Sequence, residues 1–201
     1  MKEIFIKGLY ILQGGEAGFI MADINIENIV VSTQVADELN IQQLADGIPD
    51  AKYNPEEFPG LILHFDVPKT AALLFSSGKV ICTGAKTMEV VDAAIKKLIK
   101  KISSVGASVS KKPDVKTQNI VASADFKKEL RLSTVAKGLL LRNVEYEPEQ
   151  FPGLIYRMDD FGVVLLLFSS GKIVCTGAKK IEDVSSAIDL MKEKLSSLGV
   201  L

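Results

Sequence analysis

The sequence contains no tryptophan, one histidine and two cysteines in 201 residues. Two cysteines are too few for a disulfide framework, so we expect both thiols to be reduced and the protein to be intracellular. The single histidine, His64, has no partner cluster that would indicate a metal site. The chain also lacks any run of about 18 apolar residues, the length that a membrane-spanning helix needs. These absences leave an ordinary globular composition, with 47% apolar residues.

The sequence also has no excess of charge of either sign. Its 24 basic and 25 acidic residues give a net charge of −1. Nucleic-acid-binding proteins are usually basic, so the composition alone mildly disfavours that class. The charge is uneven, because residues 21–110 hold 8 basic and 11 acidic residues (−3) and residues 111–201 hold 14 and 12 (+2). Any electrostatic surface must therefore be local.

What the sequence does have is an internal duplication. Residues 58–86 recur as residues 151–179, at an offset of 93 and with 18 identities in 29 positions. Such a repeat predicts two copies of one structural unit. We place the first repeat at residues 21–110 and the second at 111–201. Residues 1–20 are predicted to be an extension outside the core, with an ordered edge strand as the alternative.

Each copy combines strand and helix signals in the same order. The first repeat predicts strands at 24–32, 61–65, 70–75 and 80–83, a short helix near 39–47 with Asn40 as N-cap, and a long helix from Thr87. The second repeat carries the same pattern, and residues 107–114 link the copies. An antiparallel sheet with its helices on one face accommodates this order, which makes the fold class α+β. Two such copies side by side form one continuous sheet.

One sheet face is apolar without an obvious cover. In residues 70–75, Leu73 and Phe75 fall on one face and Ala72 and Leu74 on the other, so both faces are apolar. Helices cover only one of them. The uncovered face predicts a binding surface, and a closed sandwich or a homodimer is the alternative.

Specific motifs identify a family. The segments Phe-Pro-Gly-Leu-Ile, Phe-Ser-Ser-Gly-Lys and Thr-Gly-Ala-Lys occur in both repeats, and Gln118-Asn119-Ile120-Val121 precedes the second set. Together with residues 147–158 they resemble the TATA-box-binding protein family, over about residues 24–199. The short, nearly symmetric chain is similar to the archaeal type.

The resemblance implies a saddle: two pseudo-symmetric repeats in one curved ten-stranded antiparallel sheet, with four helices on the convex face. It implies a general transcription initiation factor, not an enzyme, that binds the minor groove of A·T-rich promoter DNA and bends it. The partners implied are transcription factor B, at Glu147 and Glu149, and the RNA polymerase preinitiation complex. No cofactor, metal or membrane is implied. On DNA the protein would be a monomer, with a free dimer left open.

The resemblance also assigns DNA-contacting residues. Wedging phenylalanines are Phe58, Phe75, Phe151 and Phe168; hydrogen-bonding residues are Asn28, Asn119, Thr83 and Thr176; the apolar floor is Val30, Val121, Leu73, Leu166, Ile81 and Val174. Candidates at phosphates are Arg157, Lys79, Lys172, Lys86 and Lys179. The strand alternation agrees, because it places Asn28 with Val30 and Leu73 with Phe75.

The first repeat departs from the family pattern. Glu57 and His64 stand where family members often carry basic residues, whereas Arg157 keeps one in the second repeat. We therefore expect weaker electrostatic binding and a shallower salt dependence than a basic homologue would show.

Two other classes of function remain open at this stage. A nucleic-acid-processing enzyme would need Asp, Lys or His in the groove, and the predicted face has almost none. A scaffold or apolar-ligand binder could use the same face. The lysines of residues 96–101 indicate a solvated helix face, or alternatively a partner surface.

Overall fold

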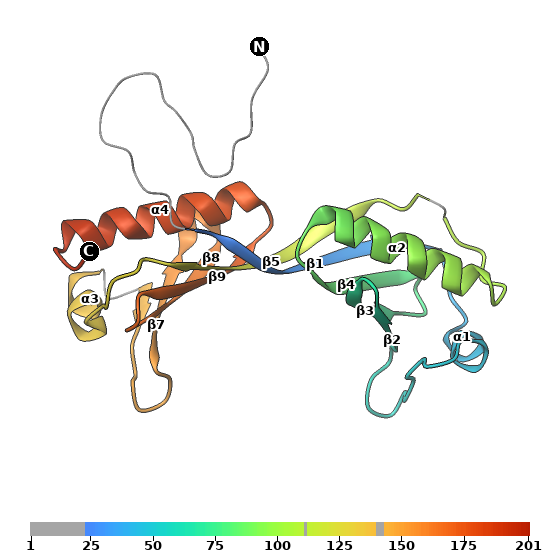
Figure 1. Cartoon of the computed structure of the whole chain (residues 1–201). Coiled ribbons are helices and arrows are strands. Elements are labelled where there is room, and N and C mark those ends of the chain that lie inside the picture. The colour runs from blue at the N-terminus through green and yellow to red at the C-terminus, as the bar shows by residue number, and fades with distance from the viewer. Residues whose placement is uncertain (1–22, 111, 140–142) are drawn as a thin grey trace, which may run out of the picture. The chain divides into compact units, whose positions relative to one another are not determined.

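The structure is a computed structural model that describes residues 23–110, 112–139 and 143–201 (Figure 1). The predicted N-terminal extension at residues 1–20 lies outside the described residues. Repeat one contains β1 (Asn25–Gln34), α1 (Ile41–Gly47), β2 (Leu61–Asp66), β3 (Lys69–Leu74), β4 (Lys79–Ala85) and α2 (Met88–Ser103). Repeat two contains β5 (Val115–Asp125), α3 (Leu132–Gly138), β6 (Val144–Glu145), β7 (Gly153–Met158), the 3-10 turn η2 (Asp159–Phe161), β8 (Val163–Phe168), β9 (Lys172–Ala178) and α4 (Ile181–Ser197).

The strands form one open antiparallel sheet in the order β2-β3-β4-β1-β5-β9-β8-β7-β6. The expected fold class is confirmed, with two repeats, one sheet and four α-helices in the described part of the chain. The resemblance implied ten strands, and the described residues contain nine. The missing one is reduced to a single antiparallel bridge between Lys52 and Ile62. This is the position of β6 in repeat two, since 52 + 93 = 145 and 62 + 93 = 155.

Local sequence signals explain where the helices of repeat one begin. The side chain of Asn40 accepts a hydrogen bond of 3.1 Å from the Gln43 backbone N–H, as the predicted N-cap should. Thr87 caps α2 in the same way, through the Val90 N–H. Each cap satisfies a backbone donor that the first turn of a helix leaves without a partner.

The tight turn between β3 and β4 depends on a glycine. Gly78 has a φ of 75°, and a Cβ atom there would lie 1.8 Å from the Ala36 carbonyl oxygen. The Gly78 carbonyl in turn accepts a hydrogen bond of 3.0 Å from the Val35 N–H, just after β1. Only a residue without a side chain allows this approach, which explains the glycine in the Phe-Ser-Ser-Gly-Lys motif.

The core of each repeat lies between its strands and its long helix. In repeat one, Leu98 and Ile102 of α2 pack with Leu61, Leu63 and Leu74, all of them at most 1% exposed. In repeat two, the matching helix α4 buries a stripe formed by Val184, Ile188, Met191 and Leu195. Figure 1 shows α2 and α4 each lying along the strands of its own repeat.

The two cysteines are part of these buried layers. Cys82 and Cys175 are free thiols, as predicted, and are at most 2% exposed. Burial raises the pKa of each thiol to about 11, so both are protonated at neutral pH. They are packing residues and carry no reactive thiolate.

Candidate nucleic-acid interface

Burial alternates along β3 and β8 and defines two faces in each repeat. In β3, Ala72 and Leu74 are buried toward the helix, whereas Ala71 and Leu73 are only half-buried. In β8 the alternation is the same, with Leu165 buried and Leu166 half-buried. We name the half-buried surface, opposite the helix, the open face of each repeat. The strands of the described residues all belong to one sheet, so no second sheet covers the open face. The alternative of a closed sandwich is therefore not formed within these residues.

The predicted DNA-contacting residues lie on these open faces. The predicted wedging, hydrogen-bonding and floor residues are all half-buried, whereas the phosphate candidates, Arg157 among them, are exposed. On repeat one these are Asn28, Val30, Phe58, Leu73, Phe75, Ile81 and Thr83; on repeat two, Asn119, Val121, Phe151, Leu166, Phe168, Val174 and Thr176. The strand register places Leu73 beside Ile81, and Leu166 beside Val174. An apolar surface of this extent is unusual on a protein exterior and indicates a binding role.

Two phenylalanines form a pair at the end of each open face. The rings of Phe58 and Phe75 are 5.7 Å apart between centroids and inclined at 66°, and those of Phe151 and Phe168 are 6.0 Å apart at 65°. This edge-to-face arrangement is favourable for aromatic rings. The glycine of the Phe-Pro-Gly motif makes it possible, since a Cβ on Gly60 would lie 2.6 Å from the Phe58 ring.

Asparagines on the central strands are held by hydrogen bonds to the neighbouring strand. The amide oxygen of Asn28 accepts from the Gly84 N–H at 2.8 Å, and that of Asn119 accepts from the Gly177 N–H at 2.7 Å. In repeat one the Asn28 Nδ2 also lies 3.0 Å from the Thr83 Oγ1. The backbone bond fixes each amide oxygen toward the protein. An amide NH2 group carries two hydrogens, and Asn28 donates one of them to Thr83.

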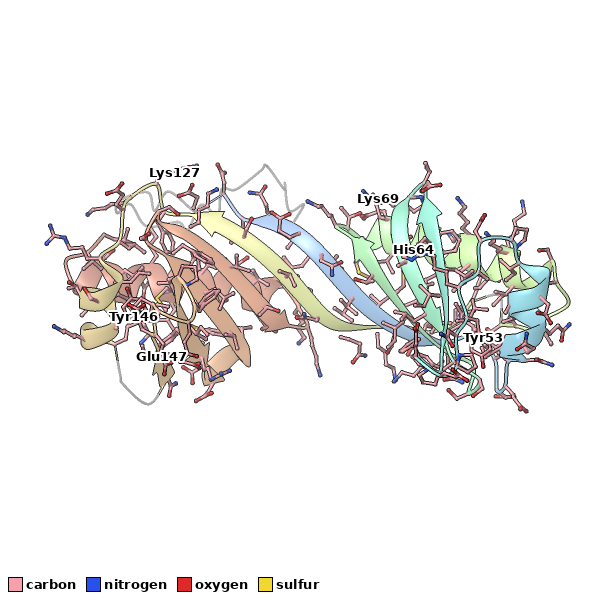
Figure 2. The ribbon with its side chains drawn as sticks, turned by 90° about the horizontal axis from the view of Figure 1, so that it is seen from below. Tyr53, His64, Lys69, Lys127, Tyr146 and Glu147 are labelled. Carbon is pink, nitrogen blue, oxygen red and sulfur yellow. The ribbon has the colours of Figure 1, made fainter. Side chains whose placement is uncertain are left out.

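Basic side chains lie around the open faces. Arg157 on β7 is exposed and lies 3.5 Å from Glu145, and Lys86 lies 2.8 Å from Glu27. Lys79, Lys172 and Lys179 are exposed. His64 is exposed on β2 of repeat one (Figure 2), at the position that Arg157 has in repeat two.

The acidic residues Glu147 and Glu149 are exposed on the loop before β7, and Figure 2 labels Glu147 there. The Glu147 carbonyl accepts from the Gln150 and Phe151 N–H groups at 2.9 and 3.0 Å. In repeat one the Asn54 carbonyl accepts from Glu57 and Phe58 in the same way. The loop is therefore a formed turn with both glutamates exposed, and the Glu147 carboxylate accepts a hydrogen bond from the Gln150 side chain.

No group of three or more His, Cys, Asp or Glu side chains that could hold a metal is found in the described part of the chain. On the open side of repeat two, hydrogen bonds from the Lys127 backbone and side chain lower the pKa of Asp125, which stabilises a charged, surface carboxylate.

No described helix is long and apolar enough to cross a membrane.

The sequence patterns missed the outer edge of each sheet. Neither Lys52 nor Glu145 is singled out by the motifs, and the sequence predicts no strand between residues 32 and 61. A strand of one or two residues has too short a pattern to be detected. The repeat offset of 93 could have indicated that Lys52 and Glu145 occupy equivalent positions.

Comparisons with known proteins agree with this architecture. The family model described as transcription factor TFIID, or TATA-binding protein, matches residues 23–105 and 114–198. The TATA-box-binding protein of Archaeoglobus fulgidus is 49% identical over 178 residues, which cover 89% of this chain and 97% of the relative. That of Thermoplasma volcanium is also 49% identical, with the same coverage.

A solved structure is similar as well. The TBP of Methanococcus jannaschii superimposes with a TM-score of 0.80 at 46% sequence identity. The match covers 87% of this chain and 98% of the solved chain. Sequence and fold therefore point to the same family.

Proposed function

The chain belongs to the TATA-binding protein family of DNA-binding transcription initiation factors, and we propose that its open faces bind the minor groove of A·T-rich promoter DNA and bend it. The observation that carries this proposal is the matched pair of phenylalanines on the open faces, Phe58 with Phe75 and Phe151 with Phe168. Membership of the family makes the protein a transcription factor and not an enzyme.

The chemistry of the minor groove supports the assignment of the central residues. A·T pairs present only the acceptors adenine N3 and thymine O2 there, and no donor. Asn28 and Asn119 keep their amide oxygens bonded to Gly84 and Gly177, so only their NH2 groups, with two hydrogens each, can meet those acceptors; Asn28 uses one of its two on Thr83. The apolar residues beside them fill the remaining contact without excluding either orientation of an A·T pair.

The phenylalanine pairs account for bending. Inserting apolar wedges between base steps unstacks them at a cost of about a few kcal/mol per step, and this family is itself the standard example. The larger surface that the bent DNA contacts offsets this unstacking cost. Phe75 and Phe168 each lie at the end of a strand and next to a tight turn, so their rings are held at the margin of the open face.

Recruitment of the transcription machinery is assigned to the acidic loop of repeat two. We propose that Glu147 and Glu149 contact transcription factor B, which then brings RNA polymerase to the promoter. Both glutamates are exposed on a hydrogen-bonded turn and are not among the residues proposed to contact DNA, which supports simultaneous binding of DNA and this partner. The protein would act in the cytoplasm on the nucleoid.

A binding titration tests the proposal directly. Fluorescence anisotropy with matched A·T-rich and G·C-rich duplexes should show a clear preference for the A·T-rich duplex. Phe168→Ala and Phe75→Ala should each weaken that binding about 10- to 100-fold, in line with a loss of about 1.4–2.8 kcal/mol.

The matched control is Phe161→Ala, which removes a half-buried phenylalanine of η2 that lies outside both pairs. It should leave the affinity within about twofold, the change expected of a substitution away from the interface. Equal binding of both duplexes, together with normal binding by Phe168→Ala, would contradict the proposal.

A further inference from the structure

The outer edges of the two repeats are equivalent in backbone but not in side chains. In repeat one, Lys52 and Ile62 exchange two backbone hydrogen bonds of 3.0 and 2.9 Å. In repeat two, Glu145 of β6 is paired with Ile155 of β7. The offset of 93 relates both members of each pair. A lysine in repeat one therefore occupies the place of a glutamate in repeat two.

Strand pairing places Lys52 on the open face. Residues directly opposite each other in an antiparallel pair project their side chains from the same side of the sheet. Ile62 is half-buried on the open face, between the buried residues Leu61 and Leu63. Lys52 projects from that same side, is exposed, and forms no ion pair with any residue that the structure describes.

In repeat two the residue that matches Lys52 is Glu145, which carries the opposite charge. Glu145 is the diagonal neighbour of Arg157, and the carboxylate and guanidinium lie 3.5 Å apart. Both side chains are more than half exposed, at 57% and 60%. A surface pair of this kind is weak, so it does not immobilise the arginine. The negative charge of Glu145 nevertheless opposes any phosphate that approaches Arg157.

Charge at the edges is therefore the reverse of charge in the whole repeats. Counted over the edge residue, the two outer strands and the turn between them, repeat one carries Lys52, Asp66 and Lys69, a sum of +1, and repeat two carries Glu145, Arg157, Asp159 and Asp160, a sum of −2. Residue 162, the counterpart of Lys69, is a glycine. By contrast, the repeats as a whole carry −3 and +2.

We infer that Lys52 is a phosphate-binding residue of repeat one, and that Glu145 weakens the phosphate contact of Arg157 in repeat two. This inference rests on the proposed function, since it requires DNA on the open faces. It adds a cation at the edge of repeat one, where Glu57 and His64 stand in place of the basic residues that family members often carry. Contacts to phosphates position a protein on DNA without reading its sequence.

The test is the salt dependence of DNA affinity. Each phosphate neutralised by a protein cation contributes about 0.9 to the slope of log K against log salt. Lys52→Gln should make the slope shallower by about that amount and weaken binding severalfold at low salt, equally for all duplexes. Glu145→Gln should strengthen binding severalfold and make the slope steeper, because Arg157 no longer faces a carboxylate.

Lys96→Gln is the matched control. Lys96 is exposed on α2, on the covered side of the same repeat, and its loss removes the same charge from the protein. The slope should not change with this variant. Circular dichroism should show that all three variants are folded.

The outcomes separate the inference from the proposed function. A wild-type protein without A·T preference overturns the proposed function itself. If the preference is present but Lys52→Gln keeps the wild-type slope, Lys52 is not a phosphate ligand. If Glu145→Gln binds no more tightly than wild type, Glu145 does not restrain Arg157. A loss with Lys96→Gln as large as that with Lys52→Gln would reduce the effect to net charge and overturn the inference.

Discussion

The two repeats agree where a contact depends on shape and differ where it depends on charge. Their phenylalanine pairs have nearly the same geometry, with centroid distances of 5.7 and 6.0 Å. Their asparagines accept backbone hydrogen bonds of 2.8 and 2.7 Å. Their outer edges, in contrast, carry Lys52 in one copy and Glu145 in the other. Duplication has thus preserved what the groove must fit, and has allowed the charges around it to diverge.

The largest expected loss of stability comes from truncating a buried side chain in the core of each repeat. Leu98 and Met191 are equivalent, and both are fully buried beneath their own sheet. Truncation to alanine removes buried apolar contacts and leaves a cavity, so Leu98→Ala should lower the free energy of unfolding by about 3–5 kcal/mol and Met191→Ala by about 2–5 kcal/mol. Chemical denaturation followed by circular dichroism measures both values.

Combining these two substitutions tests whether the repeats are independent. If each repeat has its own core, the double variant should lose the sum of the two single effects to within about 0.5 kcal/mol. Ile99→Ala is a control, since Ile99 is only partly buried on α2 and should cost less. A coupling well above that limit would mean that the helices of the two repeats share one packing unit.

The next largest loss of stability is expected from replacing the glycines of the tight turns. Gly78 and Gly171 have positive φ values of 75° and 88°, and an added Cβ would meet backbone oxygen at 1.8 and 2.3 Å. Alanine in this conformation costs about 1–2 kcal/mol before any clash. We expect Gly78→Ala to lose about 3 kcal/mol in thermal or denaturant unfolding, and Gly171→Ala somewhat less because its clash is milder.

Gly199 separates the cost of the positive φ from the cost of the steric clash. Its φ is 69°, but an added Cβ would meet nothing within 4 Å. Gly199→Ala should therefore cost only the conformational part, about 1–2 kcal/mol. A loss at Gly78 no larger than that at Gly199 would show that the turn relaxes away from the Ala36 carbonyl.

These turns also show how far the sequence predicts the fold. Repetition of the Phe-Ser-Ser-Gly-Lys motif predicts both hairpins, and Asn40 correctly marks the start of α1. Alternation along residues 70–75 separates the two faces of the sheet, because every second residue must face the helix. Strand ends were less accurate: β4 runs from Lys79 to Ala85, beyond the predicted 80–83.

The edge pairing could not be predicted in the same way. A bridge of one residue at Lys52 leaves no periodic pattern, and its partner Ile62 is distant enough in sequence to give no local signal. The proximity of Glu145 and Arg157 likewise arises only from the register of β6 and β7. The sequence therefore predicted the central residues of the candidate site and Arg157 at its margin, and strand pairing added Lys52 and Glu145 there.

A smaller difference lies at the start of the short helices. Asn40 caps α1, whereas Arg131 at the start of α3 makes no side-chain cap hydrogen bond. Asn40→Ala should cost about 1 kcal/mol, and Arg131→Asn should stabilise repeat two by a similar or smaller amount. Differential scanning calorimetry of both variants measures the two shifts. An unchanged melting temperature for Arg131→Asn would show that the α3 end is already satisfied by solvent.

The smallest expected effect on stability concerns an ion pair that only repeat one forms in the described structure. Lys86 and Glu27 are 2.8 Å apart but 62% and 42% exposed. In repeat two, Lys179 matches Lys86, and Gln118 stands in the place of Glu27, since 27 + 91 = 118. Glu27→Gln should change the free energy of unfolding by less than about 1 kcal/mol, because exposed pairs contribute little.

The same substitution should have a visible effect on DNA binding. If Lys86 contacts phosphate, removing the nearby carboxylate should strengthen binding and steepen the salt dependence, as at Glu145. The matched change in repeat two, Gln118→Glu, should act in the opposite direction by placing a carboxylate near Lys179. Affinities that do not respond to either change would confine phosphate binding to the outer edges. In that case Lys52 and Arg157 would carry the electrostatic difference between the repeats.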